Sequence, residues 1–470
     1  GIAVPAYTTY VTRDYEYIIS DCSPSVVIVS NDEQFNKISE ICKKNSCIKK
    51  IFSFEKLSGI VSKSYLNIEN LINDTNLFKE IKLQKHANRT DPACIIYTSG
   101  TQGNPKGVIL SHGGILSNCE GGYELLKPIL ETENRFLTWL PLSHSYEHAV
   151  QFIQIAVGAK VFYAESIDKL IKNMSECSPH IMTAVPRFYQ NLYQKINSTF
   201  SKAKGFKRFL VNNTVRLGTK KFRKEDMTFK DKFINFVVEK LVRKKIKNQF
   251  GGSLKTFVSG GGALDAEIGT FLNSIGLPTL QGYGLTETSP VVSCNPINDI
   301  RIETVGIPFK CNEVKIADDG EILVKGENVM LGYWNNVDET KKVLKNGWLH
   351  TGDIGWIDSD GYIYVTGRCD DMVITGGENV HLAEIDDVLL NHPEIDDVAA
   401  VGIDDEDWGQ VIAVAVVTHN QEIMKESDIV DFCRGKISSY KLPRRVMFLS
   451  RLPYNSIGKL DRIKIKQLFN

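Results

Sequence analysis

The sequence predicts an α/β protein with a large N-terminal domain and a small α+β domain at its C-terminal end. The chain has 470 residues, which is too many for one compact core. Short apolar runs alternate with amphipathic stretches, as in sheets whose strands are connected by helices. At residues 367–370 the pattern changes to short apolar strands and acidic helical segments. We therefore assign residues 1–366 to the first domain and 371–470 to the second, which is within the usual size range.

Three apolar runs predict buried strands in the large domain, at residues 25–30, 93–97 and 254–259. The second run leads into a loop of Gly, Ser and Thr, and the third leads into Gly260, Gly261 and Gly262. In open parallel sheets, ligands bind beyond the carboxyl ends of the strands. We therefore expect one site that is shared by the two loops.

The remaining apolar stretches have simpler interpretations. Residues 398–401 and 411–417 are expected to be strands of the C-terminal domain. Residues 149–164 contain Gln and Lys, so this stretch predicts a buried hydrophobic element rather than a membrane span, which needs about 18 or more apolar residues.

Amino-acid composition indicates in which cellular environment the protein works. Lys and Arg together number 56, as do Asp and Glu, so the overall charge does not indicate a partner. Ten cysteines contain no C-x-x-C pair, which favours reduced thiols in a cytosol-facing protein over a disulfide framework or a zinc ribbon. The chain begins at Gly1 without a Met or a signal-peptide pattern, so we expect that natural N-terminal residues are missing.

One region departs from this charge balance. Residues 202–247 contain sixteen Lys or Arg and four acidic residues, a net charge of +12, with helical patterning and several phenylalanines. Two interpretations remain open: charged faces around a core stripe, or an interfacial surface for anionic lipid. Nucleic acid is a weaker third interpretation, because no recognition motif accompanies the charge.

The strongest local motif is YTSGTQGNPKG at residues 97–107. Its glycines permit tight turns that expose backbone N–H groups. Its hydroxyls and Lys106 add donors and a positive charge, so the segment predicts a cradle for phosphate oxygens. The Walker spacing G-x-x-x-x-G-K-[ST] is absent.

Four further segments carry candidate chemistry. Residues 281–289 offer Tyr283 as a flat face for a base, Thr286 as a hydroxyl donor, and Glu287 as a hard carboxylate suited to Mg²⁺. Asp353 lies in a predicted glycine-flanked turn, where a carboxylate would suit ribose hydroxyls. The other segments are residues 367–371 with 376–380, and residues 453–462, which contain Lys459 in a predicted turn.

In this order and spacing, the five segments resemble the adenylate-forming (ANL) superfamily of acyl-CoA synthetases, luciferases and peptide-synthetase adenylation domains. The resemblance covers nearly the whole chain. GIAVPAY at residues 1–7, VPRF at 185–188 and the basic helical insertion resemble the long-chain fatty acyl-CoA synthetase branch. The resemblance implies stacked αβ sheets in an N-terminally truncated large domain, followed by a small mobile domain.

The resemblance also implies roles for individual residues. The catalytic set is Lys459, Thr286, Glu287 and His144, with Glu287 as the Mg²⁺ ligand. The ATP-binding set is Thr98, Ser99, Gly100, Thr101, Gly103, Lys106, Gly261, Gly262, Ala263, Tyr283, Gly284, Asp353 and Arg368. The coenzyme A set is Gly376, Gly377 and Lys441. Asp370 would be the pivot of a hinge at 367–370.

The function implied is ATP-dependent activation of a long-chain fatty acid, followed by transfer to coenzyme A. The alternatives are an acyl-AMP ligase that loads a carrier protein, and a non-catalytic lipid-binding relative. ATP, Mg²⁺ and coenzyme A are the expected cofactors and cosubstrates, and nucleic acid is not an expected partner. The expected location is the cytoplasmic face of the endoplasmic reticulum or another membrane, with peripheral contact through residues 202–247.

One motif points elsewhere. Residues 144–148 read HSYEH, which matches the H-x-x-E-H pattern of some zinc peptidases. A zinc site would require a helix there and a third ligand. The preceding Pro141-Leu-Ser instead resembles the superfamily segment whose His lines the acyl and thiol pocket, so we favour that role for His144.

Overall fold

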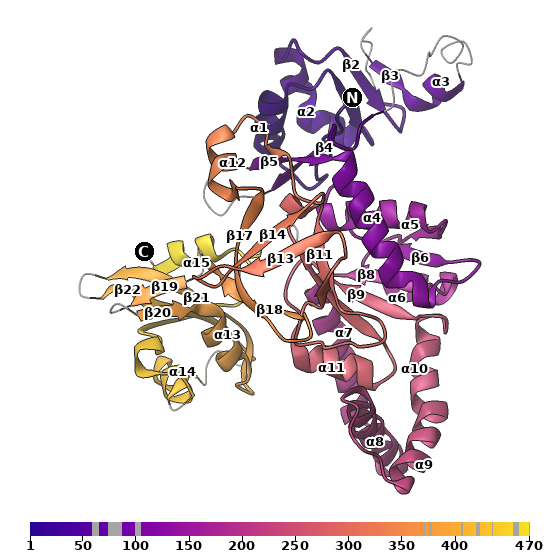
Figure 1. The fold of residues 1–470 in the computed structure, drawn as a ribbon, viewed down its shortest axis with the longest axis vertical. Coiled ribbons are helices and arrows are strands. Elements are labelled where there is room, and N and C mark those ends of the chain that lie inside the picture. Colours follow the sequence, from indigo (N-terminus) through magenta and orange to yellow (C-terminus); the bar gives the residue numbers. More distant parts are fainter. Residues whose placement is uncertain are drawn as a thin grey trace.

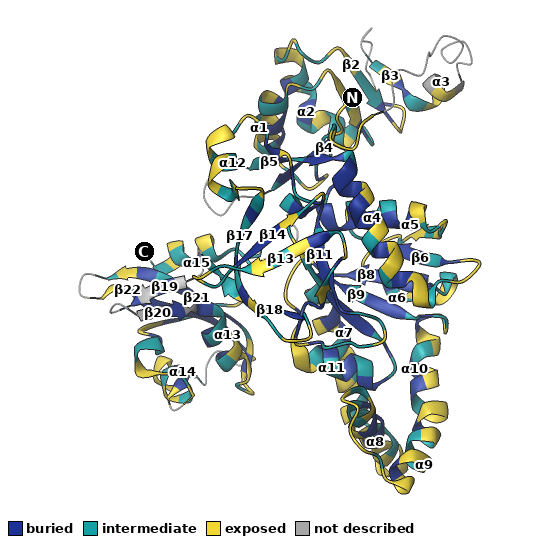
Figure 2. Ribbon diagram, viewed as in Figure 1, coloured by how far each residue is buried: buried dark blue, intermediate teal, exposed yellow. Residues whose placement is uncertain are grey.

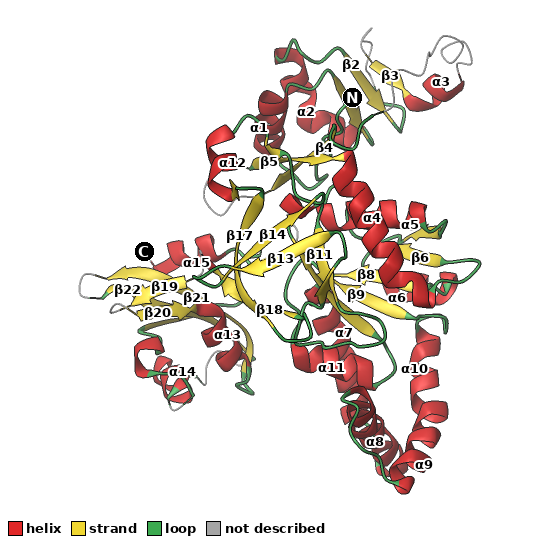
Figure 3. Ribbon diagram, in the orientation of Figure 1, coloured by secondary structure: helices red, strands yellow, loops and turns green. Residues whose placement is uncertain are grey.

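The computed structural model describes residues 1–58, 65–73, 87–98, 105–369, 372–375, 378–405, 408–419, 424–434, 436–454 and 460–469. Several packed sheets with helices around them form the body, and the last hundred residues form a smaller unit at one side (Figure 1). This arrangement confirms the predicted α/β class with a large N-terminal and a small C-terminal domain. Helices and strands alternate through most of the chain (Figure 3).

The central sheet has seven strands in the order β12-β11-β10-β9-β8-β6-β7, of which the pairs from β7 to β10 are parallel. Its strands are β6 (Arg135–Thr138), β7 (Lys160–Tyr163), β8 (Ile181–Ala184), β9 (Thr256–Ser259), β10 (Thr279–Gly284), β11 (Val291–Cys294) and β12 (Ile307–Pro308). β9 confirms the strand predicted at 254–259.

Helices cover both faces of this sheet. They are α4 (His112–Leu126), α5 (Ser145–Ala156), α6 (Leu170–Cys177), α7 (Pro186–Ser201) and α11 (Ala266–Ser274), with a 3₁₀ turn η1 (Lys127–Ile129) after α4. Ile181 packs with α4 and α5, whereas its neighbour Met182 packs with α6, α7 and α11. Because consecutive strand residues point to opposite faces, β8 is buried on both sides.

A second sheet is antiparallel and carries part of the site. It contains β13 (Asn312–Ile316), β14 (Glu321–Gly326), β16 (Leu344–Lys345), β17 (Trp348–Ile357) and β18 (Ile363–Arg368). A 3₁₀ turn η3 (Thr286–Thr288) connects β10 and β11 of the central sheet, and helix α12 (Val337–Val343) precedes β16.

A third sheet corrects the expected position of the run at 93–97. That run is in β4 (Pro92–Thr98), which pairs antiparallel with β5 (Lys106–Ser111), and β15 (Gly332–Tyr333) completes this small sheet. The run is a buried strand, as predicted, but it is not in the parallel sheet of β9. Because Thr98 pairs with Lys106, the predicted phosphate segment connects two strands of a hairpin.

The N-terminal residues form a separate parallel sheet of β1 (Val26–Val29), β2 (Lys50–Ser53) and β3 (Tyr65–Asn67). α1 (Thr12–Cys22) and α2 (Asp32–Lys44) precede and follow β1, and α3 (Ile68–Asn73) follows β3. The run at 25–30 is a strand, but the prediction that it is buried was wrong. Val26 and Ile28 are exposed, because β1 is an edge strand whose inward side chains alternate with outward ones.

The stretch at 149–164 also differs from its prediction. It divides between α5 and β7, and Ile155 and Tyr163 are exposed. Both elements lie at the outside of the body, where a helix or edge strand buries only one side. Within the described ranges, no helix combines the length and apolar character that a membrane span requires.

Between α7 and β9 the chain forms an arm that projects from the body, with α9 at its far end (Figure 1). It consists of α8 (Gly205–Phe222), α9 (Phe229–Val238), a π-helical turn η2 (Glu239–Arg243) and α10 (Lys244–Gln249). These helices correspond to the basic stretch at 202–247.

The C-terminal unit has one sheet with a hydrophobic cluster on each face. Its strands are β19 (Met372–Thr375), β20 (Glu378–His381), β21 (Ile395–Asp405), β22 (Gly409–Thr418) and β23 (Arg445–Phe448). Its helices are α13 (Leu382–Leu390), α14 (Glu426–Cys433), the 3₁₀ turn η5 (Ser439–Lys441) and α15 (Arg462–Phe469). β21 and β22 confirm the two predicted strands. β18 ends at Arg368, inside the interval predicted as the hinge, and the hinge role stays a prediction because Asp370 lies outside the described residues.

Candidate active site

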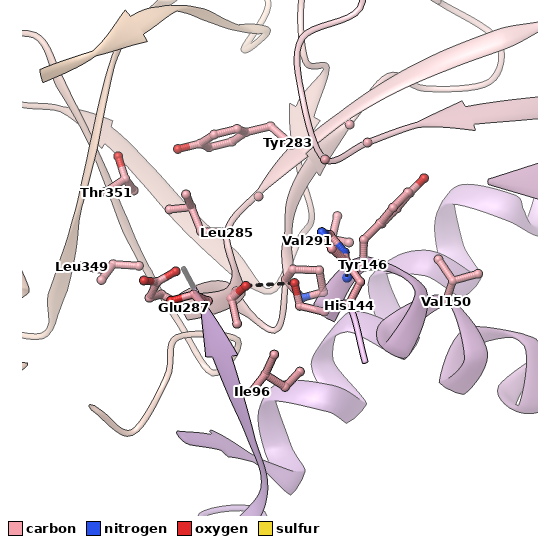
Figure 4. Close-up of a pocket in the computed structure, with 18 of the residues that line it drawn as sticks. Ile96, His144, Tyr146, Val150, Tyr283, Leu285, Glu287, Val291, Leu349 and Thr351 are labelled. Carbon is pink, nitrogen blue, oxygen red and sulfur yellow. Dashed lines mark hydrogen bonds between the residues drawn. The ribbon is translucent and has the colours of Figure 1, made fainter. Parts of the chain in front are cut away.

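A cavity of about 700 Å³ lies where the central sheet, the second sheet and the β4–β5 hairpin meet. The strand β10 and the 3₁₀ turn after it contribute one side, and α5 contributes the other (Figure 4). Nine residues predicted from the sequence line it, namely Thr98, Lys106, His144, Gly261, Tyr283, Gly284, Thr286, Glu287 and Arg368. Thr98 and Lys106, at the two ends of the first predicted loop, and Gly261 of the second therefore line one cavity, although the two loops follow strands of different sheets.

Other predicted residues lie elsewhere. Gly262 and Ala263 are exposed at the rim, and Lys441 pairs with Glu384 inside the C-terminal unit, at 2.6 Å between Nζ and Oε2. Ser99, Gly100, Thr101, Gly103, Asp370, Gly376, Gly377 and Lys459 lie outside the described residues.

Tyr283, Asp353 and Arg368 form one polar group at the charged end of the cavity. The hydroxyl of Tyr283 donates to Oδ2 of Asp353 at 2.6 Å, and Nε of Arg368 lies 3.3 Å from the other carboxylate oxygen. Burial, followed by the negative charge of Asp353, raises the pKa of Tyr283 well above its usual value. The phenol therefore remains a neutral hydrogen-bond donor.

The prediction that Asp353 lies in a turn was wrong. It is in the middle of β17, directly opposite Arg368 of β18. The preceding Gly352 has a φ of +72°, a conformation that glycine adopts at little cost. The sequence suggested a turn because Gly352 and Gly355 flank Asp353, and glycines so placed are common in turns. The structure shows an irregular strand instead.

Thr286 and Glu287 each acquire a partner from a distant segment. The hydroxyls of Thr286 and Ser145 are 3.0 Å apart, a contact drawn in Figure 4. The hydroxyl of Tyr333 donates to Oε1 of Glu287 at 2.9 Å. These contacts fix two polar side chains at the cavity wall.

Lys106 is held by an acidic residue that the sequence did not single out. Its Nζ lies 2.6 Å from Oε2 of Glu339 on α12, and 5.2 Å from the centre of the Tyr333 ring. Hydrogen bonds from Lys106 and then Lys342 lower the pKa of Glu339 to about 2. A carboxylate thus neutralises the cation that was predicted to bind phosphate.

His144 is at the N-terminal end of α5, facing the cavity (Figure 4). Its Nδ1 accepts a hydrogen bond from the backbone N–H of Tyr146 at 3.1 Å, so Nδ1 carries no proton in this arrangement. The neutral ring then carries its proton on Nε2, where it can donate.

The other members of the H-x-x-E-H motif have different surroundings. The carboxylate of Glu147 is fully buried and accepts a hydrogen bond from the hydroxyl of Thr183 at 2.8 Å. Its burial raises its pKa to about 7. His148 contacts the carbonyl of Leu142 and the ring of Phe152. Among the described residues, no three His, Cys, Asp or Glu side chains are grouped so as to hold a metal ion.

The opposite end of the cavity is apolar. Side chains from α4, α5, β6, β8 and β9 line it, and they are Leu125, Leu126, Phe136, Val150, Ile153, Ile181 and Val258. The cations among the described lining residues, Lys106, Lys342, Lys345 and Arg368, come instead from β5, α12, β16 and β18. One cavity therefore joins a charged compartment to a hydrocarbon-like compartment.

Sequence reasoning missed several of these residues. Ser145 adjoins His144 in the same motif, so it could have been found by extending that segment. Tyr333 and Glu339 are in the GYWNNVDET segment at 332–340, which contains no glycine-rich loop and gave no chemical signal. Only the pairing of β15 with β5 brings them to Lys106 and Glu287.

Two family models match the chain. The model described as AMP-binding enzyme matches residues 1–334, and that of the AMP-binding enzyme C-terminal domain matches residues 384–459. The chain therefore belongs to the AMP-binding enzyme family, within the adenylate-forming (ANL) superfamily.

Individual relatives are similar over most of the chain. A long-chain-fatty-acid–CoA ligase, FadD15, of Mycobacterium bovis is 29% identical over 86% of this chain and 67% of its own length. A 2-succinylbenzoate–CoA ligase of Bacillus cereus is 31% identical over 83% of this chain and 73% of its own length.

Solved structures show the same fold. ATP-bound MatB from Rhodopseudomonas palustris superimposes with a TM-score of 0.78 at 24% identity, covering 100% of this chain and 84% of that one. MenE from Bacillus subtilis, in complex with the acyl-adenylate OSB-AMP, gives 0.74 at 23% identity, covering 99% of this chain and 83% of that one.

Proposed function

We propose that this protein is an AMP-forming acyl-CoA ligase that activates a long-chain fatty acid as its acyl-adenylate and transfers the acyl group to coenzyme A. The observation that carries the proposal is the single cavity with a charged and an apolar end. A long hydrocarbon would occupy the apolar end, and its carboxylate would meet ATP at the charged end.

The chemistry explains why such a cavity is useful. A carboxylate is a poor acyl donor, because its leaving group would be oxide. Attack of the carboxylate on the α-phosphate of ATP makes that oxygen part of AMP, a good leaving group, and releases pyrophosphate. Two anions must approach each other, so positive charge and hydrogen-bond donors are needed where they meet. We assign this role to Lys106 and the Thr286 hydroxyl, which both line the cavity, and Lys459 is proposed to bridge the carboxylate and the α-phosphate.

Mg²⁺ would enter with ATP. The donor set fits a hard cation, because the carboxylate of Glu287 lines the cavity with hydroxyl groups beside it and phosphate oxygens would supply further oxygen ligands. Bound there, the ion would reduce the negative charge of the phosphates. Tyr333 fixes the Glu287 carboxylate through a 2.9 Å hydrogen bond, so this side chain is oriented before ATP binds.

The apolar compartment supports a fatty acid as the substrate. A second carboxylate, as in 2-succinylbenzoate, would call for a cation at that end, whereas the described cations are at the charged end. The similarity to FadD15 supports the same assignment. Activation of an aromatic acid is the second candidate, since 2-succinylbenzoate–CoA ligases are similarly related. The coenzyme A step is assigned to Gly376, Gly377 and Lys441, with the small domain turning about Asp370.

The substrate assignment is tested by AMP release with saturated acids of 8 to 20 carbons and with 2-succinylbenzoate, each with and without coenzyme A. We expect the highest kcat/KM for the longer acids and an acyl-CoA product. A preference for the aromatic acid would favour the second candidate. Release of pyrophosphate without acyl-CoA would favour loading of a carrier protein, and no pyrophosphate exchange with any acid would favour a non-catalytic lipid-binding protein.

A pair of variants on α5 locates the acyl chain. Val150 lines the cavity, whereas Ile155 on the same helix is 65% exposed. Val150→Phe should fill the apolar end and lower kcat/KM for the longest acids at least about tenfold relative to the shortest, because overfilled cores accommodate added volume poorly. Ile155→Phe is the matched control and should leave the chain-length profile unchanged. Equal profiles for both variants would place the acyl chain elsewhere.

A further inference from the structure

The arm formed by α8 to α10 presents phenylalanines to solvent. Phe229, Phe233 and Phe236 on α9 are 92%, 70% and 57% exposed, and their spacing of i, i+4 and i+7 places them on one side of the helix. Phe206 and Phe209 on α8 are also exposed and stack on each other. The interpretation that these aromatics form a core stripe is therefore wrong (Figure 2).

Most of the positive charge of the arm has no anionic partner. Of the sixteen Lys and Arg at residues 202–247, which include two just before α8, the ones that form ion pairs are Arg216, Lys220, Lys224 and Arg243. Eleven others are exposed and form no ion pair among the described residues, and they are Lys202, Lys204, Lys207, Arg208, Lys221, Arg223, Lys230, Lys232, Lys240, Lys244 and Lys245. This surface retains a strong positive potential.

The lysines and phenylalanines are next to each other. Nζ of Lys232 lies 5.7 Å from the centre of the Phe229 ring, and Nζ of Lys240 lies 4.4 Å from that of Phe236. An apolar stripe with flanking cations is the pattern of helices that lie in the interface of an anionic membrane. The rings can enter the acyl boundary while the ammonium groups remain at the level of the headgroups.

The arm is also held firmly at its base. Arg243 is buried, and its guanidinium donates to the carbonyls of Ser274 on α11 and Thr214 on α8, each at 2.8 Å. Asp231 pairs with Arg216 at 2.9 Å and thereby ties α9 to α8. These contacts hold α9, and with it the row of phenylalanines, in a fixed direction away from the body. Arg243 is buried in these contacts, so it is not one of the exposed cations.

We propose that the arm is a docking surface for an anionic lipid bilayer, with Phe229, Phe233 and Phe236 inserted at the interface and the surrounding lysines facing lipid headgroups. A nucleic acid or an acidic protein would also attract the charge. A bilayer fits the exposed row of three phenylalanines best, because immersion in its interface would remove all three rings from water while the flanking lysines stay at the headgroups. The inference does not depend on the identity of the acid that the cavity accepts.

The experiment measures co-sedimentation of the whole chain with vesicles of phosphatidylcholine alone or with about 30% phosphatidylserine. Each cation near such a surface adds about fivefold to the partition coefficient, so we expect at least about tenfold tighter binding to the anionic vesicles. Because the Debye length falls to about 3 Å at 1 M salt, binding should be largely lost there. Equal binding to both vesicles would overturn the proposal.

Three variants assign the binding to the arm. The first changes Lys232, Lys240, Lys244 and Lys245 to Gln, the second changes Phe229, Phe233 and Phe236 to Ser, and the control changes Lys44, Lys49, Lys56 and Lys310 to Gln. All of these side chains are exposed, so none of the changes should disturb the core. We expect each arm variant to bind anionic vesicles at least about tenfold more weakly, and the control to bind nearly as well as the original chain.

The same variants also distinguish binding to lipid from binding to other anions. Equal losses in the control and the first variant would show a general charge effect and overturn the proposal. Full binding by the Phe-to-Ser variant would leave only electrostatic attraction and overturn insertion of the rings. An oligonucleotide or a polyglutamate that binds the arm more tightly than the vesicles at equal salt would replace lipid as the partner. Circular dichroism checks that each variant remains folded.

Discussion

Individual side chains in the cavity are positioned by partners that are far away in the sequence. Asp353 receives the Tyr283 hydroxyl, Glu287 receives that of Tyr333, and Lys106 pairs with Glu339. The sequence suggested roles for Glu287 and Lys106, whereas it gave no such signal for their partners Tyr333 and Glu339. The consequence is that these polar groups already have partners within the protein, and a bound nucleotide would compete with some of these contacts.

The Lys106–Glu339 pair gives the first residue-scale prediction. ATP phosphates and Glu339 would compete for the same ammonium group, so Glu339→Gln should lower the KM for ATP about two- to fivefold, as expected for loss of a partly exposed ion pair. Isothermal titration with ATP and steady-state kinetics measure the change. Glu313→Gln, which removes an exposed partner of Lys325, is the control. A higher KM in Glu339→Gln would mean that Glu339 instead holds Lys106 in its binding position.

Glu147 gives a prediction about pH. Its folded-state pKa is about 7 against an ordinary value of 4.5, so the folded protein holds this proton more tightly than the unfolded chain. The associated stability is fully present below pH 4.5 and is lost as the pH rises through about 7, by about 3 kcal/mol in all.

Glu147→Gln is neutral at every pH and should remove this dependence. The difference in unfolding free energy between variant and original chain, measured in urea at pH 5 and pH 8, should therefore move in favour of the variant at pH 8. Glu267→Gln, at an exposed position of α11, should show no such shift. A constant difference across this interval would mean that Glu147 does not titrate there.

Among the secondary-structure elements, the β17–β18 hairpin brings two polar residues together at the charged end of the cavity. Its register places Asp353 opposite Arg368, although fifteen positions separate them in the chain. Gly352, with its positive φ, allows β17 to twist at this point, and an added Cβ would lie 3.3 Å from a terminal nitrogen of Arg368. The backbone conformation at Gly352 therefore controls the geometry of the Asp353–Arg368 pair.

Gly352→Ala tests this coupling at the scale of the element. A left-handed conformation costs a residue with a side chain about 1–2 kcal/mol, so the unfolding free energy should fall by about that amount. The KM for ATP should rise as well, because the methyl group meets Arg368. Gly361→Ala in the same hairpin is the control: Gly361 also has a positive φ, but its Cβ would meet no heavy atom within 4 Å. If both variants keep the original KM, Gly352 has no part in positioning Arg368.

At the scale of the whole molecule, the large and small domains touch through a few specific side chains. The guanidinium of Arg187, at the start of α7, lies 4.9 Å from the centre of the Tyr454 ring. The hydroxyl of Tyr454 in turn donates to Asp397 of β21 at 2.6 Å. Arg187 follows Val185 and Pro186, which lie beside Gly261 and Gly262 at the rim of the cavity. The contact therefore links the cavity rim to the orientation of the small domain.

Arg187→Ala should weaken this orientation without unfolding either domain. A cation–π contact of this kind contributes about 0.5–1 kcal/mol, enough to change the ratio of two orientations about two- to fivefold. Distances between spin labels on α6 and α14 should become more broadly distributed. Arg444→Ala removes a similar contact with Trp408 inside the small domain and serves as the control. Unchanged distances in Arg187→Ala would show that other contacts set the orientation.

The sequence by itself determined the class of fold, the principal strands and nine of the residues that line the candidate cavity. Apolar runs such as 254–259 and 411–417 specify strands locally, and glycine-rich, hydroxyl-rich segments specify anion-binding loops wherever they are placed. These features depend on neighbours in the chain, so they can be read without knowing the fold. Helix formation in the basic stretch at 202–247 was predictable for the same reason.

Only the tertiary structure decided which residues complete the cavity and which surfaces remain uncovered. Glu339 and Tyr333 reach Lys106 and Glu287 through the pairing of β15 with β5, and Asp353 meets Arg368 through strand register. The phenylalanines of α9 look like core residues in the sequence, yet no other element covers them. Long-range pairing and burial depend on the path of the whole chain, and local amino-acid patterns do not encode that path.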